Sequence, residues 1–178
     1  MSDSADALIR RAHRARRENR PSDAHQDFVE AVSLCRRTGG RSELVRALKG
    51  LGQIERDFGR GDAARPLYEE AVALCREEGQ PLALAHTVRH LGDIHRDAGR
   101  VELAEPCYRE ALALYRSSEQ TPPLDLANAA RAMAILKEAA GEVGEARRLW
   151  EEAGDLYAAA NVPAGVAESS ARLARLTR

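Results

Sequence analysis

One segment of the sequence recurs at a spacing of about forty residues, and this repeat constrains the fold more than any other feature. The segment Leu51–Cys75 is followed by a similar segment, Leu91–Tyr115, in which most apolar positions are kept. A weaker copy occupies Met133–Tyr157, and another precedes Leu51 and ends in Phe28, Ala31, Leu34 and Cys35. A fixed period of this size is typical of a solenoid, in which each repeat buries its apolar face against its neighbours.

The composition favours helices over strands. Ala, Leu, Arg and Glu dominate the sequence, and all four have a high helix propensity. Long runs of Val, Ile and Thr, which would favour strands, are missing from the sequence. We therefore expect an all-α protein.

The spacing of apolar residues and the positions of Gly and Pro predict four helix hairpins and a C-terminal capping helix. The chain, residues 1–178, is predicted to be one domain with repeats at about 4–40, 41–80, 81–120 and 122–161. The expected helices after the first repeat cover about 42–58, 61–78, 82–98, 101–118, 124–140, 143–160 and 164–176.

Small and large residues alternate in a way that explains how the repeats would stack. Small residues stand near the middle of each first helix, at Ala12, Gly52, Gly92, Ala134 and Ala174. Large aromatic residues stand on the second helices, at Phe28, Tyr68, Tyr108 and Trp150. An aromatic ring from one helix can fill the space that small residues leave on another.

The order Leu-Gly, turn glycine, Ala, aromatic, Ala resembles the tetratricopeptide repeat over nearly the whole chain. The residues that follow this order are Leu51, Gly52, Gly59, Ala64, Tyr68 and Ala71, and then Leu91, Gly92, Gly99, Ala104, Tyr108 and Ala111. The period exceeds the about 34 residues usual in that family. With the segments Arg65–Tyr68 and Glu105–Tyr108, the sequence is more similar to the longer repeats of kinesin light chains and their bacterial relatives. The resemblance implies a right-handed superhelix whose first helices line a concave groove that binds a peptide or another protein.

With that geometry, eleven polar residues would line the groove: Arg46, Lys49, Gln53, Arg56, His86, Arg89, His90, Asp93, Arg96, Asn128 and Arg131. Repeat one would add His13 and Arg16. Cations outnumber acids among these residues, and guanidinium and ammonium groups suit carboxylates, so the groove would take an acidic segment or the C-terminus of a partner. The alternative interpretation is that these residues are only the solvated faces of charged helices.

The residues His86, His90 and Asp93 also suggest a metal site, since spacings of four and three place them on one helix face. A single helix gives no obvious fourth ligand, and no cysteine stands nearby. Ordinary polar residues of the groove are therefore the expected interpretation, with no metal or other cofactor. His95 falls beside the repeat core, where a packed histidine with a hydrogen-bond partner is expected.

Charge and motifs exclude several classes of function. The net charge of −1 gives no general attraction to nucleic acid or to an acidic membrane surface. The sequence has no apolar run of the roughly 20 residues that span a bilayer, no export signal, and none of the common enzyme motifs. We expect a cytoplasmic protein that is not an enzyme and has no catalytic residues, with reduced cysteines at Cys35, Cys75 and Cys107.

The sequence therefore predicts a scaffold or adaptor that binds a peptide or protein segment in its groove. The alternative is a regulatory or self-associating repeat module, with a homo-oligomer left open. A third class, RNA binding through the arginine-rich stretch Arg10–Arg20, is disfavoured because no aromatic residues are interleaved for base stacking.

Overall fold

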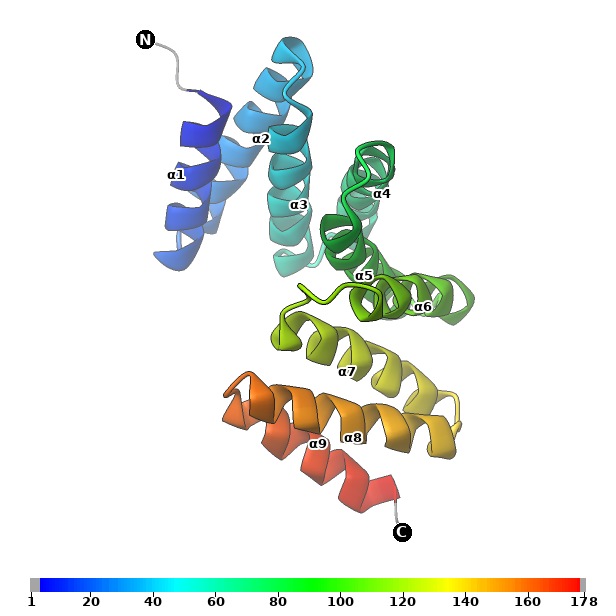
Figure 1. Cartoon of the computed structure of the whole chain (residues 1–178). Helices are drawn as coiled ribbons and strands as arrows, with labels where there is room; N and C mark the ends of the chain where they lie inside the picture. The colour runs from blue at the N-terminus through cyan, green and yellow to red at the C-terminus, as the bar shows by residue number, and fades with distance from the viewer. Residues whose placement is uncertain (1–3, 177–178) are drawn as a thin grey trace. The chain divides into compact units, whose positions relative to one another are not determined.

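The structure, a computed structural model, describes residues 4–176, and this part of the protein has nine α-helices and no β-strand (Figure 1). In order along the sequence the helices are α1 (Ala5–Arg17), α2 (Pro21–Thr38), α3 (Arg41–Asp57), α4 (Gly61–Glu77), α5 (Pro81–Asp97), α6 (Val101–Arg116), α7 (Pro123–Ala139), α8 (Val143–Ala159) and α9 (Pro163–Leu176). The first eight pair as four hairpins, and α9 follows them. The predicted all-α fold of four hairpins and a final helix is confirmed.

Short turns end the helices where the sequence has glycine or asparagine. Gly59 follows α3 with a φ of 73°, and Asn161 follows α8 with a φ of 55°. After Gly59, the backbone N–H of Arg60 donates to the carbonyl of Glu55 at 2.8 Å. Such a bond satisfies a carbonyl group that the helix end leaves unpaired, so the turn is both short and well defined.

Most helix ends lie within one residue of the predicted ones, and the largest difference is at the end of α6. The sequence predicts a helix to residue 118, but α6 ends at Arg116. The hydroxyl groups of Ser117 and Thr121 donate to the carbonyl oxygens of Leu114 (2.9 Å) and Tyr115 (2.6 Å). Side-chain donors thus replace the backbone N–H groups that would continue the helix.

The structure divides into two compact units, one that ends at Gln80 and one that begins at Pro81. We call them the N-terminal unit (α1–α4) and the C-terminal unit (α5–α9) and describe each by itself. The division falls between the predicted repeats at 41–80 and 81–120. The single domain over residues 1–178 and its right-handed superhelix stay predictions.

In the N-terminal unit, α1, α2 and α3 lie side by side, and α3 also packs against α4 (Figure 1). In their core, aromatic rings pack directly against glycine residues. A Cβ atom on Gly50 would lie 2.3 Å from the ring of Phe28, and one on Gly52 would lie 2.7 Å from the ring of Tyr68. Both rings are buried, so the two glycines are what allow these helices to approach each other.

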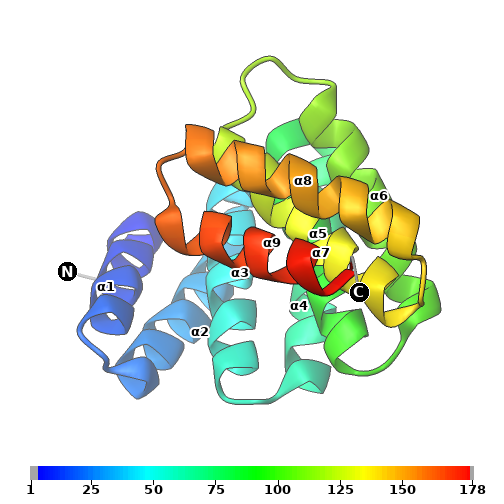
Figure 2. The same cartoon turned by 90° about the horizontal axis from the view of Figure 1, so that it is seen from below.

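In the C-terminal unit, α5 packs against α6 and α7, and α8 packs against α7 and α9. Figure 2 shows α9 running alongside α8. The rings of Tyr108 and Trp150 are wholly buried in this unit. A Cβ atom on Gly92 would lie 2.7 Å from the ring of Tyr108, and one on Gly165 would lie 2.4 Å from the ring of Tyr157. The predicted packing of an aromatic ring against a small residue therefore occurs in each unit, at Gly52 with Tyr68 and at Gly92 with Tyr108, whereas the contacts at Gly50 and Gly165 were not predicted.

A buried carboxylate near the end of α3 joins two hairpins of the N-terminal unit. One oxygen of Glu55 lies 2.7 Å from Nε2 of His25 on α2, and the other accepts from Nε of Arg60. The hydrogen bond from Arg60 lowers the pKa of Glu55, although burial opposes this change. Glu55 is therefore a paired ion between α2, α3 and the start of α4.

The equivalent position in α7 carries the opposite charge. Lys137 is buried, and its Nζ donates to Glu105 of α6 at 2.9 Å and to Glu142 before α8 at 3.0 Å. The hydrogen bond to Glu105 raises the pKa of Lys137 above its usual value. At the same position in α5 stands a buried histidine, His95, whose Nδ1 accepts from Nε of Arg100 at 3.3 Å.

The close approach at Gly92 gives a stability prediction. Gly92→Leu should destabilise the protein by about 1–3 kcal/mol or more, because the new side chain must displace the buried ring of Tyr108. The matched control is Gly144→Leu in α8, where a Cβ atom would meet nothing within 4 Å. Urea unfolding of the two variants tests this, and equal midpoints would contradict the packing described above.

Candidate functional site

The predicted groove residues fall into two sets, one in each unit. The set in the N-terminal unit lies on α3 and consists of Arg46, Lys49, Gln53 and Arg56. The set in the C-terminal unit lies on α5, with His86, Arg89, His90, Asp93 and Arg96, and on α7, with Asn128 and Arg131. Because α5 and α7 are neighbours, we call this second set the α5–α7 face.

Asp93 is the centre of the α5–α7 face, and its carboxylate is buried beneath the side chains around it. Its Oδ1 accepts a hydrogen bond from the hydroxyl of Tyr108 at 2.8 Å, and its Oδ2 accepts one from Nη1 of Arg89 at 3.3 Å. Nδ1 of His90 and Nη1 of Arg96 each lie 3.5 Å from a carboxylate oxygen. The spacing of three and four residues on α5 places these three groups around one carboxylate.

The surroundings of Asp93 keep it ionised. Burial alone would raise the pKa of Asp93, because an ionised carboxylate loses its hydration. The hydrogen bond with His90, the charge of Arg89 and the hydrogen bond from Tyr108 act in the opposite direction. Together they lower the pKa from 3.8 to about 2. Burial and the Asp93 charge raise the pKa of Tyr108, so its hydroxyl stays a donor.

The hydrogen bonds of His90 define its tautomer. Nη2 of Arg89 lies 2.8 Å from Nε2 of His90, and a guanidinium group can only donate. Nε2 therefore accepts, and the proton of the neutral ring sits on Nδ1, which faces Asp93. The ring of His86 lies beside that of His90, with centroids 4.6 Å apart. Among the residues that the structure describes, no group of three or more His, Cys, Asp or Glu side chains could hold a metal ion.

The two predicted residues of α7 are also held by partners. Oδ1 of Asn128 accepts a hydrogen bond from the hydroxyl of Tyr157 on α8 at 2.8 Å. Arg131 forms a two-pronged ion pair with Glu168 of α9, at 2.6 and 2.9 Å. This pair lowers the pKa of Glu168 and raises that of Arg131. The helix α9 therefore supplies the carboxylate that Arg131 binds.

The positive charges of the α5–α7 face are thus compensated inside the C-terminal unit. Arg89 and Arg96 share Asp93, and Arg96 also pairs with Asp97 at 2.8 Å. The side chain of Arg89 is only 14% exposed, and that of Arg131 is 37% exposed. A carboxylate ligand on this face would have to compete with carboxylates that are already in place.

Among the predicted residues of α3, Arg46 is 46% exposed, more than Arg89, Arg96 or Arg131. Arg46 pairs with Asp6 of α1 at 2.8 Å, and Gln53 donates to Asp57 at 2.8 Å. Lys49 and Arg56 are half-buried on the same helix. Since α1 lies beside α3, these side chains form a surface that continues onto α1.

Sequence reasoning missed the residues that hold the α5–α7 face in position, because they come from other helices. It gave Tyr108 a packing role only, whereas the structure adds a hydrogen bond to Asp93. It gave the capping helix no part in the site, whereas Glu168 binds Arg131. One signal was available: a buried tyrosine carries a hydroxyl group that needs a partner, unlike Phe28 at the equivalent position.

All three cysteines are thiols rather than halves of a disulfide. Cys35 and Cys75 are buried at equivalent places in the first two repeats, and Cys107 is half-buried. Burial raises the pKa of Cys35, which keeps this thiol protonated and unreactive.

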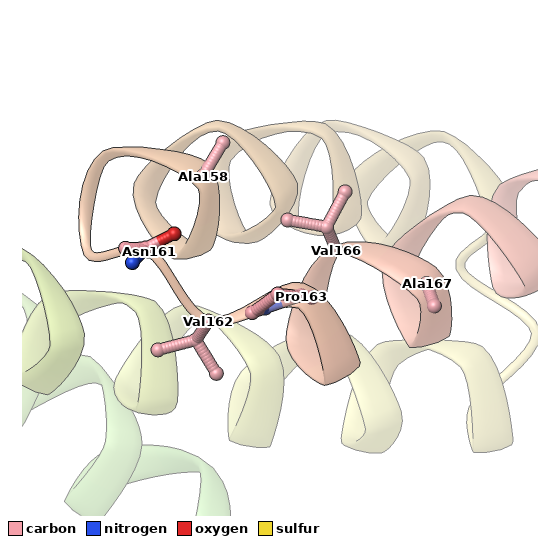
Figure 3. Close-up of a pocket in the computed structure, with 6 residues that line it drawn as sticks. All are labelled: Ala158, Asn161, Val162, Pro163, Val166 and Ala167. Atoms are coloured by element: carbon pink, nitrogen blue, oxygen red, sulfur yellow. The ribbon is translucent and has the colours of Figure 1, made fainter.

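A hollow of about 360 Å³ lies at the turn between α8 and α9, away from the residues predicted from sequence. Figure 3 shows the side chains that line it, which are mostly apolar. They are Ala158, Asn161, Val162, Pro163, Val166 and Ala167.

The lowered pKa of Asp93 predicts a pH-dependent contribution to stability. A carboxyl group whose pKa falls on folding stabilises the protein above its unfolded pKa and loses that effect as the pH falls. The shift from 3.8 to about 2 corresponds to about 2 kcal/mol. The free energy of unfolding of wild type minus that of Asp93→Asn should therefore be about 2 kcal/mol larger at about pH 6 than at about pH 2. Urea unfolding across this range measures the gap, and a gap independent of pH would contradict the assignment.

The comparisons with known proteins agree with the repeat pattern. Residues 43–117 match the tetratricopeptide repeat family. This match spans the two repeats in which the sequence pattern is strongest. No curated protein matches the sequence.

Solved structures match almost the whole chain. The TPR-like repeats of a Podosopora anserina protein described as a kinesin light chain superpose with a TM-score of 0.77 at 18% identity, covering 99% of this chain and 87% of that one. A variant of the same protein gives a TM-score of 0.78, with the same identity and coverage. BtubC (BKLC) from P. vanneervenii gives 0.63 at 20% identity, covering 97% of this chain and 88% of that one. At these identities the likeness establishes the fold.

Within residues 4–176, none of the helices combines the length and apolar character needed to cross a membrane. Repeats of the tetratricopeptide family are generally protein–protein interaction modules. We conclude that residues 43–117 match the tetratricopeptide repeat family and that the protein has the fold of TPR-like helical repeat arrays.

Proposed function

We propose that the protein is a scaffold or adaptor without catalytic activity that binds an extended segment of another protein on the first helices of its hairpins. The observation that carries this proposal is the ordered polar surface on α5 and α7. Its side chains are held by defined hydrogen bonds, as at Asp93, Asn128 and Arg131, so they do not have to be ordered when a partner binds. Such pre-organisation lowers the entropic cost of association.

The chemistry of these first helices suits a partner with carboxylate groups, either on acidic side chains or at the C-terminus of the partner. Guanidinium groups bind carboxylates in a planar, two-pronged geometry, as Arg131 already does with Glu168. A backbone segment would also find both donors and acceptors here, since Gln53 and Asn128 carry amide groups.

Paired charge reversals test the proposal. Lys49→Glu combined with Arg131→Glu changes one first helix in each unit and should weaken partner binding about tenfold or more, because two favourable contacts become repulsive. The partner is obtained by capture from the source cell on the immobilised protein, identified by mass spectrometry, and its affinity is measured by calorimetry. Arg89 and Arg96 are poorer choices, because their reversal would place new carboxylates beside Asp93, whose side chain is 9% exposed, whereas Glu168 beside Arg131 is 30% exposed.

The matched control is Arg36→Glu combined with Arg147→Glu. These exposed arginines lie on the second helices α2 and α8, one in each unit. Their reversal changes the net charge by the same amount as the reversal of Lys49 and Arg131. The control should bind the partner as wild type does. Equal weakening in both double variants would show a general charge effect and would contradict a site on the first helices.

A second candidate function is self-association through the C-terminal unit. The observation that favours it is the apolar hollow between α8 and α9. Val166→Glu should then dissociate a dimer, while Ser170→Glu on the exposed side of α9 should leave it intact. Size-exclusion chromatography at several concentrations measures this, and a monomer at every concentration would contradict it.

RNA binding through the first helix is disfavoured by the ion pairs there. Arg10 pairs with Asp6, Arg11 with Asp27 at 2.6 Å, and Arg20 with Glu18 and Asp23. Asp27 is only 10% exposed, so a phosphate group at Arg11 would have to displace a nearly buried carboxylate.

A further inference from the structure

The arginines on α1 and α3 are held differently from those of the α5–α7 face. Arg16 pairs with Asp57 at 3.2 Å and Arg46 pairs with Asp6 at 2.8 Å. The four side chains are 41–46% exposed, whereas Asp93 is buried beneath its cations. Exposed ion pairs contribute little to stability, so these arginines can change their carboxylate partner at small cost.

His13 is fixed among these arginines. Its ring meets that of Phe28 edge-on, with centroids 5.2 Å apart and an interplanar angle of 84°. Phe28 is itself buried against Gly50, where a Cβ atom would lie 2.3 Å from the ring. The imidazole of His13, an exposed residue on α1, therefore packs against the ring of Phe28 on α2, and this ring packs in turn against α3.

The charge around His13 is predominantly positive. Burial lowers the pKa of His13, and the charges of Arg16, Arg17 and Arg46 lower it further. Two of these arginines lie on α1 and one comes from α3, while α2 presents the uncharged Phe28. The carboxylates that pair with Arg16 and Arg46 therefore do not cancel the positive potential at this imidazole.

We infer that the surface formed by His13, Arg16, Arg17, Arg46 and Lys49, the α1–α3 face, is where the acidic segment of the partner binds, with His13 making that binding pH-dependent. The inference rests on the proposed function and narrows it to one unit and one ligand class. Carboxylates brought to this face favour the protonated imidazole. By linkage, binding must then tighten as the pH falls through the range in which His13 titrates, while glutamate side chains remain charged.

The α1–α3 face suits an acidic peptide better than a nucleic acid. Phe28 is wholly buried, so it offers no surface for base stacking. Arg46 and Arg16 already bind the carboxylates of Asp6 and Asp57, and a glutamate side chain offers them a group of the same kind.

A capped hexaglutamate peptide is the probe for this face. At low ionic strength, Arg16→Gln combined with Arg46→Gln should weaken its binding to the full-length protein about tenfold. Arg36→Gln combined with Arg37→Gln removes the same charge from the exposed side of α2 and should bind within about twofold of wild type. If the first double variant does not fold, Arg17→Gln combined with Lys49→Gln replaces it in the same comparison.

His13→Gln tests the pH dependence separately. Wild type should bind hexaglutamate several-fold more tightly at about pH 5.5 than at about pH 7.5, and His13→Gln should show little change over this range. In NMR titrations of wild type, saturating peptide should raise the pKa of His13. Each unit of increase corresponds to about tenfold tighter peptide binding to the protonated than to the neutral imidazole.

Three results would overturn the inference: no binding of hexaglutamate, equal loss in the two double variants, or loss only on Arg131→Gln in the C-terminal unit. The last would leave the proposed scaffold function intact, because an acidic segment would still bind the first helices. A charge-matched oligouridylate that binds more tightly than hexaglutamate would instead assign the face to nucleic acid.

Discussion

The fold depends on aromatic rings that lie directly against glycine. Where the ring of Tyr108 meets Gly92, the helices of the hairpin approach more closely than any larger residue would allow. The same contact recurs at Tyr68 and Gly52. Since protein interiors are close-packed, each such contact fixes the distance and rotation of one helix pair. The polar side chains of the first helices are positioned by this packing, because Arg89 and Arg96 stand three and four residues from Gly92 on the same helix.

Packing and polar chemistry meet in one residue pair. Tyr108 fills the space over Gly92 with its ring and binds Asp93 with its hydroxyl group. Asp93 in turn holds Arg89 and Arg96. A change in the core at this crossing would therefore reach the surface through three successive side chains. The N-terminal unit has no such link at Phe28, whose ring carries no polar atom, and Arg16 and Arg46 pair with exposed carboxylates instead.

The sequence was enough to predict the helices, because Gly92, Tyr108 and their equivalents repeat at a fixed period and short-range apolar spacing defines each helix. It also located the polar residues of α5 and α7. It could not show that their charges are compensated. The partners of Arg131 and Asn128 come from α9 and α8, at Glu168 and Tyr157, and periodicity does not reveal which side chains from other helices point toward them. The comparisons establish the fold and match residues 43–117 to the tetratricopeptide repeat family, while the residues that bind a partner stay a prediction.

The reversed charges of Glu55 and Lys137 bear on how such a protein avoids assembling in the wrong order. Hairpins with the same apolar pattern can dock on the wrong neighbour during folding. If α3 took the place of α7, Glu55 would meet Glu105 instead of His25, and two carboxylates would share a buried position. An unpaired buried charge is costly, so the wrong arrangement would be much less stable than the right one. The two ionised side chains thus distinguish hairpins that share one apolar pattern, and the apolar pattern alone cannot do so.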